Sequence, residues 1–128
     1  MANYDPDEYV EAVLALVERI PPGRVMTYGS IAEYLGPRFG GGGPRRVGTI
    51  MSHYGGPVPW HRVVNAAGRL VPGHEARARR LLTAEGVTFR GDNVALKVHA
   101  WWPDEEGRAG TARDAAGATG RNPRRASR

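Results

Sequence analysis

The chain has 128 residues, which suits one domain with a modest hydrophobic core and is too short for two ordinary ones. Hydrophobic residues make up 41% and charged residues 24%, as in an ordinary globular protein. The formal net charge of +5 favours a polyanionic partner such as nucleic acid, although a basic surface that only faces solvent has the same composition.

The sequence contains no cysteine, which excludes disulfides, thiolate metal ligands and a cysteine nucleophile. No apolar run approaches the roughly 18 residues of a membrane span, and the acidic first residues do not resemble a signal peptide. We therefore expect a cytoplasmic, nucleoid-associated monomer without cofactor or metal.

The first predicted element is a helix over about residues 6–19. Asp5 is a good N-cap, Pro6 suits the first helical position, and Glu8 lies three residues after the cap. Apolar residues then recur at helical spacing until Pro21 and Pro22 end the helix.

Two further short helices predict a helix-turn-helix. The first begins at the cap Thr27 and ends at Gly36, residues 36–43 form a flexible loop, and the second runs from Pro44 to the glycines after Tyr54. The second carries Arg45 and Arg46 near its start, as a DNA-recognition helix does. Many helical hairpins share this pattern, so it is only moderately specific.

The rest of the chain predicts a hairpin, a fourth helix and a tail. A strand over residues 60–65 turns into residues 69–71, a helix follows over about residues 75–85, and residues 88–96 form a short strand or extended segment. We expect residues 1–103 to form one domain and residues 104–128 a disordered basic tail. The predicted fold is mainly α with a short β-hairpin, a winged helix-turn-helix-like DNA-binding domain.

Three segments in order carry a resemblance to a known family: Arg24–Ala32, Arg45–Gly48 and Pro59–Val64. Together they resemble the O6-alkylguanine-DNA alkyltransferases, whose active-site motif is Pro-Cys-His-Arg-Val. Trp60 stands where that motif has its cysteine, which is the mark of the alkyltransferase-like proteins. Those proteins bind alkylated guanine in DNA without repairing it. The match covers about residues 6–90.

The resemblance implies that His61 matches the family's general base and Glu85 the carboxylate that orients it. Without a thiol to activate, His61, Arg62 and Glu85 would be remnants of a relay. The alternative, which we favour for His61 and Arg62, is that they only hydrogen-bond the loop and the neighbouring helix.

The resemblance also implies a lesion pocket formed by Val58, Pro59 and Trp60. The flat apolar face of an indole suits a flipped base with its added alkyl group. The alternative is that Trp60 is ordinary core. The stretches Gly55–Val58 and Leu70–His74 are compact, so we expect an open pocket that accepts larger adducts, and we assign no binding residue within 70–74.

For DNA contact, the resemblance implies that Arg45 inserts into the duplex and that Tyr28 crowds the 3′ phosphate of the target. Gly48 would let the backbone approach the minor groove closely. The alternatives are a phosphate contact for Arg45, a core aromatic for Tyr28 and close helix packing for Gly48. Candidate phosphate contacts on the same helix are Thr49, Ser52 and His53.

The predicted function is recognition of double-stranded DNA that contains O6-alkylguanine, by base flipping and without alkyl transfer. By the resemblance, nucleotide excision repair proteins would then process the marked site. One alternative is a helix-turn-helix transcriptional regulator that reads undamaged DNA. However, the predicted recognition helix, which begins at Pro44, offers few base-reading side chains. A hydrolase that uses His61 and Glu85 is the other alternative, and it lacks a convincing nucleophile.

Overall fold

The computed structural model describes residues 6–40 and 43–103. The elements follow in the order α1 (Pro6–Arg19), β1 (Met26–Thr27), α2 (Tyr28–Phe39), α3 (Gly43–Tyr54), the 3₁₀ helix η1 (Trp60–Arg62), β2 (Val63–Val64), α4 (Glu75–Ala84), β3 (Phe89–Arg90), β4 (Asn93–Val94) and α5 (Leu96–His99). The disordered tail expected over residues 104–128 and the cap Asp5 lie outside the described residues.

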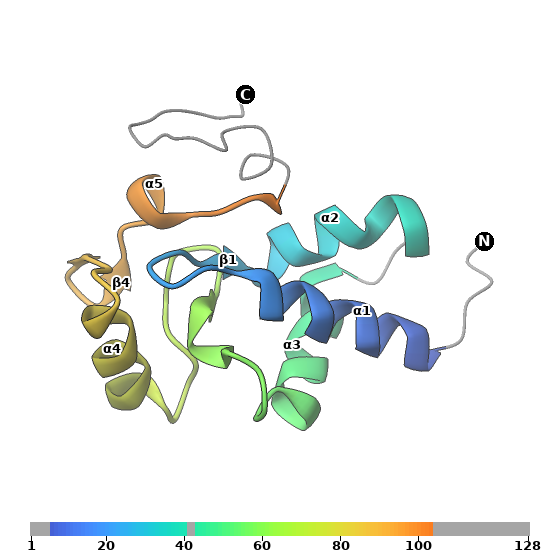
Figure 1. Cartoon of the computed structure of the whole chain (residues 1–128), viewed down its shortest axis with the longest axis horizontal. Coiled ribbons are helices and arrows are strands. Elements are labelled where there is room, and N and C mark those ends of the chain that lie inside the picture. The colour runs from blue at the N-terminus through green and yellow to red at the C-terminus, as the bar shows by residue number, and fades with distance from the viewer. Residues whose placement is uncertain (1–5, 41–42, 104–128) are drawn as a thin grey trace.

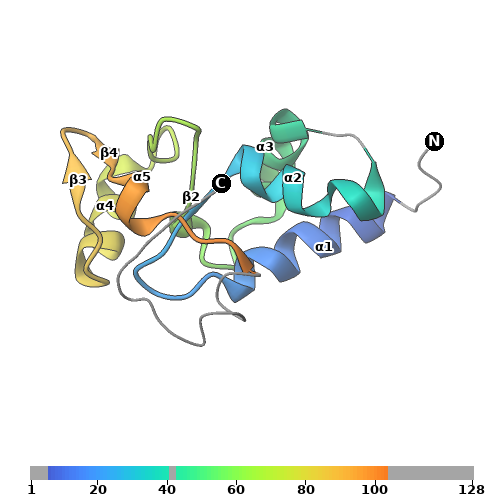
Figure 2. The same ribbon diagram turned by 90° about the horizontal axis from the view of Figure 1, so that it is seen from above.

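Helices α1, α2 and α3 form one end of the molecule, and α4, the β3–β4 hairpin and α5 form the other (Figure 1). The view from above shows the same division (Figure 2). A mainly helical, helix-turn-helix-like domain is therefore confirmed. None of the described helices is both long and apolar enough to cross a membrane.

The two ends are joined by short parallel pairings around β1. Met26 pairs with Val63 of β2, and Val25, on the other side, forms a bridge with Ala100. Successive side chains on a strand point to opposite faces. Met26 and Val63 accordingly belong to a different apolar cluster from Val25 and Val64.

Each end has its own apolar core. The core of the helical end is made by α1, α2 and α3 with buried residues from the loops, and its members include Tyr9, Val13, Val17, Ile31, Phe39, Val47, Ile50, Val58 and Trp101. The core of the other end surrounds α4, and its buried members are Val25, Val64, Leu70, Ala78, Leu82, Val87 and Val94. Burial of these side chains is the main force that holds the fold together.

Helices α1 and α4 lie within a residue of the bounds that apolar spacing predicts. Thr27 caps α2 as predicted, and its capping box is closed by Ser30, whose amide and hydroxyl both bond to Thr27. The predicted end of this helix at Gly36 is wrong, because α2 continues through Pro37 to Phe39. Phe39 is buried edge-on against the ring of Tyr9, and this tertiary contact overrides the local stop signal.

The predicted hairpin over residues 60–71 is also wrong in its pairing. Residues 60–62 form η1, and β2 pairs in parallel with β1, so the short antiparallel hairpin of the fold is β3–β4. A strand would send His61 and Arg62 to opposite faces, whereas the tight turn of η1 lets both reach Glu85.

The turn that follows β2 lies where the sequence predicts it, at residues 66–68. Asn65 Oδ1 accepts hydrogen bonds from the amides of Ala67 and Arg69 at 2.9 and 2.8 Å. Gly68 has a φ of +90°, and a Cβ there would lie 2.6 Å from the carbonyl oxygen of Val94. Only glycine allows this close approach of the turn to β4.

Candidate nucleic-acid interface

One face of α3 is directed outward. Val47 and Ile50, on its inner face, are buried with α1 and α2 in the core of the helical end. Residues three and four apart share a face of a helix. The outer face carries four predicted DNA contacts, of which Gly48 is half-buried and the others are exposed: Arg45, Gly48, Thr49 and Ser52.

Gly48 has open space where a side chain would be. A Cβ built there meets no atom within 4 Å. One interpretation of this glycine is close packing against another helix. The described residues offer no such helix next to Gly48. The backbone of α3 is bare at this point, in the middle of the outer face.

Polar groups on the same face are turned back onto α3. The hydroxyl of Thr49 donates to the carbonyl of Arg45 at 3.2 Å, and Nδ1 of His53 lies 3.0 Å from the carbonyl of Thr49. The guanidinium of Arg45 is paired with no carboxylate in the part of the chain that the structure describes. Its charge is available to a polyanion.

Tyr28 is the first residue of α2 and is half-buried against the core of the helical end. Its backbone is fixed by the capping box of Thr27. Burial raises the pKa of the Tyr28 phenol above its ordinary value of 10.0, so the hydroxyl is neutral at physiological pH. A neutral hydroxyl can donate a hydrogen bond to a phosphate without charge repulsion.

Trp60 opens η1 and is half-buried. Its indole packs partly on the core around α4 and lies edge-on to two imidazoles, His61 at 6.0 Å and His74 at 5.8 Å between ring centroids. The guanidinium carbon of Arg77 lies 5.7 Å from the centroid of the indole. Trp60 is therefore not a fully enclosed core residue, and part of its side chain is open to solvent.

His61, Arg62 and Glu85 form one hydrogen-bonded cluster. Nε2 of His61 lies 2.8 Å from Oε2 of Glu85, and Arg62 donates to the same carboxylate through Nε at 3.1 Å and Nη2 at 2.8 Å. Arg62 also donates to the carbonyl of Ile20 at 2.9 Å, and the amide of Gly23 donates to Glu85 at 3.0 Å. The cluster joins η1, the end of α4 and the turn after α1.

The carboxylate of Glu85 is stabilised in its charged form. Burial favours the neutral acid, but hydrogen bonds from Arg62, the amide of Gly23 and His61 outweigh it and lower the pKa from 4.5 to about 2. Glu85 is thus an anion at neutral pH that holds two cationic or polar side chains in place. These contacts hold η1, the end of α4 and the turn after α1 together, and this structural role does not depend on any reaction.

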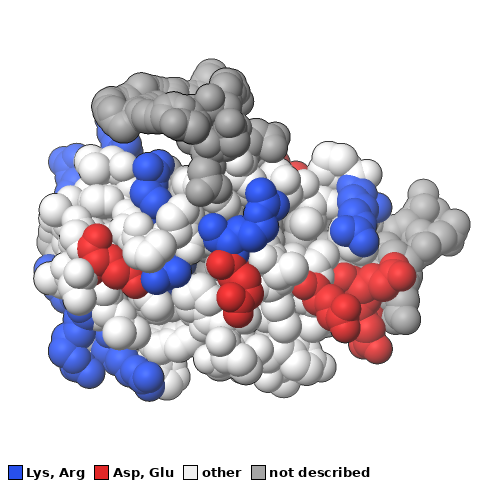
Figure 3. Space-filling model, in the orientation of Figure 1, with Lys and Arg blue, Asp and Glu red and all other residues white. Residues whose placement is uncertain are grey.

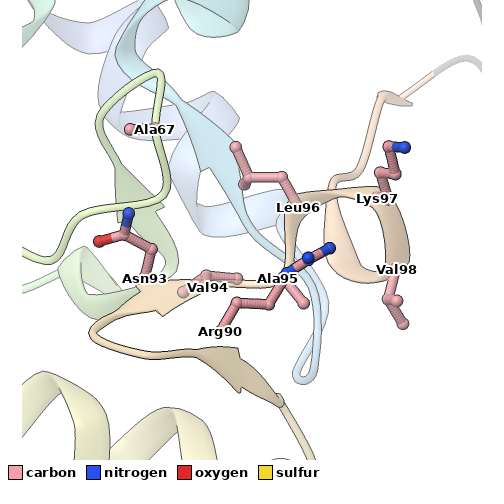
Figure 4. Close-up of a pocket in the computed structure, with 8 residues that line it drawn as sticks. All are labelled: Ala67, Arg90, Asn93, Val94, Ala95, Leu96, Lys97 and Val98. Atoms are coloured by element: carbon pink, nitrogen blue, oxygen red, sulfur yellow. The ribbon is translucent and has the colours of Figure 1, made fainter.

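The surface charge is uneven. On the face seen in Figure 3, Lys and Arg gather at the end formed by α4, the hairpin and α5, and acidic side chains lie over the start of α1, where Asp7 and Glu8 stand. A pocket of about 430 Å³ lies at the basic end, between the turn after β2, the hairpin and α5 (Figure 4). It is lined by Ala67, Arg90, Asn93, Val94, Ala95, Leu96, Lys97 and Val98, so it includes none of the predicted lesion-pocket residues.

The structure brings the predicted residues together in two groups. One is the outer face of α3, and the other joins Trp60, His61, Arg62 and Glu85. Val58 is buried in the core of the helical end and Pro59 is half-buried beside Trp60. Sequence reasoning missed two neighbours of the indole, His74 and Arg77; the basic run of α4 was a signal, but such a run commonly faces only solvent.

The fold and these two groups define a helix-turn-helix-like DNA-binding domain. A family model described as "6-O-methylguanine DNA methyltransferase, DNA binding domain" matches residues 8–87. A "DNA base-flipping protein" of Vibrio parahaemolyticus is 32% identical over 103 residues, which span 76% of this chain and 99% of that protein. "Alkyltransferase-like protein 1" of Schizosaccharomyces pombe is 40% identical over 109 residues, 76% of this chain and 97% of that protein.

A solved structure gives the same result. The crystal structure of S. pombe Atl1 in complex with damaged DNA containing O6-carboxymethylguanine superposes with a TM-score of 0.64 at 33% identity, and the match covers 78% of this chain and all of that one. The chain belongs to the family of the 6-O-methylguanine DNA methyltransferase DNA-binding domain and, within it, is an alkyltransferase-like protein.

Proposed function

We propose that this protein binds O6-alkylguanine in duplex DNA, turns the damaged base out of the stack and does not remove its alkyl group. The observation that carries the proposal is the half-exposed indole of Trp60, which directly precedes a His61–Glu85 hydrogen bond of 2.8 Å. Alkyl transfer needs a soft nucleophile in front of such a base, and the chain contains no cysteine.

The outer face of α3 supports contact with the duplex. Arg45 offers an exposed planar cation near the start of the helix, and Gly48 leaves the backbone bare three residues later. An arginine can stack among bases and fill the gap that a flipped nucleotide leaves, while its charge stays close to phosphates. Tyr28, held at the start of α2, would crowd the phosphate of the target nucleotide.

The names of the relatives point in the same direction. Proteins similar to this chain are called DNA base-flipping protein and alkyltransferase-like protein 1, and Atl1 is crystallised with DNA that carries O6-carboxymethylguanine. O6-alkylation weakens pairing, so a modified guanine leaves the stack at a lower cost than a normal one. We propose that the bound complex marks the lesion for nucleotide excision repair proteins and that the protein acts as a monomer.

A labelled substrate separates recognition from repair. The protein is mixed with a duplex whose O6-methylguanine carries an isotope in the methyl group; a native gel then measures complex formation and a denaturing gel locates the label. We expect a complex with all label on the DNA. Label on the protein in proportion to its amount would overturn the absence of alkyl transfer.

A further inference from the structure

The indole of Trp60 has two basic neighbours on the side of α4. His74 is the N-cap residue of α4 and lies 5.8 Å from the indole between ring centroids. Arg77, in the first turn of the same helix, has its guanidinium carbon 5.7 Å from the indole centroid. A cation within about 6 Å of an aromatic centroid is in attractive range. A group stacked beside Trp60 would therefore lie close to a positive charge.

The charge of Arg77 is not neutralised by a neighbour. Both ion pairs in the described part of the chain involve Glu85. Glu75, two residues before Arg77, instead accepts a hydrogen bond from the amide of Gly73 at 3.0 Å. Arg79 of α4 is engaged elsewhere, stacked 4.1 Å from the ring centroid of Phe89 and bonded to the carbonyl of Gly91.

The approach of Arg77 to the indole is a loose one. Arg77 is exposed, as is His74, and its distance to the indole lies at the long end of the attractive range. The guanidinium can turn toward an adduct that rests against the indole without breaking a strong contact. A planar guanidinium with several N–H donors is well suited to bind a carboxylate through two parallel hydrogen bonds.

We propose that Arg77, with His74 beside it, makes the Trp60 site selective for O6 adducts that carry a negative charge, such as a carboxymethyl group. The inference rests on the proposed function, because it concerns an adduct placed against Trp60. A phosphate contact by Arg77 is the competing assignment. It would strengthen binding to every duplex equally, whereas adduct reading changes only the ratio between adducts.

The test uses four duplexes of one sequence, in which the central base is guanine, O6-methylguanine, O6-carboxymethylguanine or O6-carbamoylmethylguanine. The last two have nearly the same shape and differ in charge. Dissociation constants are measured at one salt concentration for the wild type and for Arg77→Gln. Arg80→Gln is the matched control, because Arg80 is an exposed arginine of the same helix.

We expect the wild type to bind the carboxymethyl duplex about tenfold more tightly than the carbamoylmethyl duplex, which is the typical effect of a hydrogen bond between charged groups. Arg77→Gln should bring this ratio close to one, Arg77→Lys should keep part of it, and Arg80→Gln should leave it unchanged. A thermal melt of each variant verifies the fold.

A wild-type ratio near one, or a ratio that Arg77→Gln does not change, overturns the inference. An equal loss of affinity for all four duplexes in Arg77→Gln also overturns it and identifies a phosphate contact. In either case the proposed function stands if the wild type still prefers O6-methylguanine to guanine. Equal binding of those two duplexes would instead overturn the proposed function itself.

Discussion

At the scale of single residues, Gly48 is informative because a glycine inside a helix lowers stability. Open space surrounds its missing side chain, so packing does not explain it. We expect Gly48→Ala to raise the free energy of unfolding by about 1 kcal/mol. Gly48→Leu should keep the fold and weaken binding to all duplexes, because its side chain would stand between α3 and the DNA backbone.

Chemical denaturation and fluorescence anisotropy with a labelled duplex measure the two effects separately. The informative control is Gly36→Ala, a second half-buried helical glycine with no atom within 4 Å of its added Cβ. Wild-type DNA affinity in Gly48→Leu would mean that this face of α3 does not approach the duplex.

Arg45 is expected to do more than attract phosphate. Arg45→Ala should lower the affinity for a lesion duplex about tenfold more than the affinity for the undamaged duplex. The reason is that no side chain then fills the gap that the flipped base leaves. Arg90→Ala removes the same charge from an exposed residue of β3, at the other end of the molecule (Figure 2). Affinities at two salt concentrations compare the variants. If both weaken the two duplexes equally, Arg45 is an ordinary phosphate contact.

Trp60→Ala should lower the ratio of lesion affinity to normal affinity, since stacking on an aromatic ring contributes about 1–3 kcal/mol per base. The indole is only half-buried, so we expect a smaller loss of stability than the roughly 3–5 kcal/mol typical of a fully buried tryptophan. Trp102 is a second half-buried tryptophan, packed edge-on to Tyr34, and Trp102→Ala is the matched control. A large drop in melting temperature with an unchanged ratio would make Trp60 a core residue.

At the scale of elements, local signals predict the helices well and their tertiary adjustments poorly. Apolar spacing locates α1 and α4, and Thr27 marks the start of α2. The extension of α2 to Phe39 depends on Tyr9, a residue 30 positions earlier, and no local pattern contains that contact. The sequence likewise does not predict the short helix α5, because its four residues carry too little periodicity to distinguish it from an extended segment.

The elements around η1 depend on Glu85 for their arrangement. Glu85→Gln leaves the charge of Arg62 without its anion. Because the pair is only partly buried, we expect a loss of about 2 kcal/mol in the free energy of unfolding, less than for a fully buried pair. In the wild type the pKa of Glu85 is lowered from 4.5 to about 2, so the folded state binds fewer protons than the unfolded state between those values. The contribution is therefore complete above pH 4.5 and is lost as the pH falls toward 2.

Urea denaturation at several pH values measures this dependence. The wild type should lose more stability than Glu85→Gln between pH 4.5 and pH 2, because only the wild type has this carboxylate to protonate. Equal slopes for the two proteins in that window would show that Glu85 contributes little to the stability of the fold.

At the scale of the whole molecule, the sequence identifies the candidate residues but does not predict which side chains surround them. The resemblance that the motif Pro59–Val64 carries implies that Glu85 orients His61. The hydrogen bond between these two side chains, 24 positions apart, fits that expectation. The motif does not indicate that Arg77 lies beside Trp60, since exposed arginines of a basic helix look alike in sequence. That proximity depends on how α4 packs beside η1.

The proposed function requires the protein to distinguish O6-alkylguanine from guanine in duplex DNA. The most direct measurement is an equilibrium titration of two duplexes that differ only in one O6-methyl group, at the same salt concentration. We predict that the modified duplex binds about tenfold more tightly or better, because its base leaves the stack at a lower cost and stacks against Trp60. Equal dissociation constants for the two duplexes would contradict the proposed function and favour a reader of undamaged DNA.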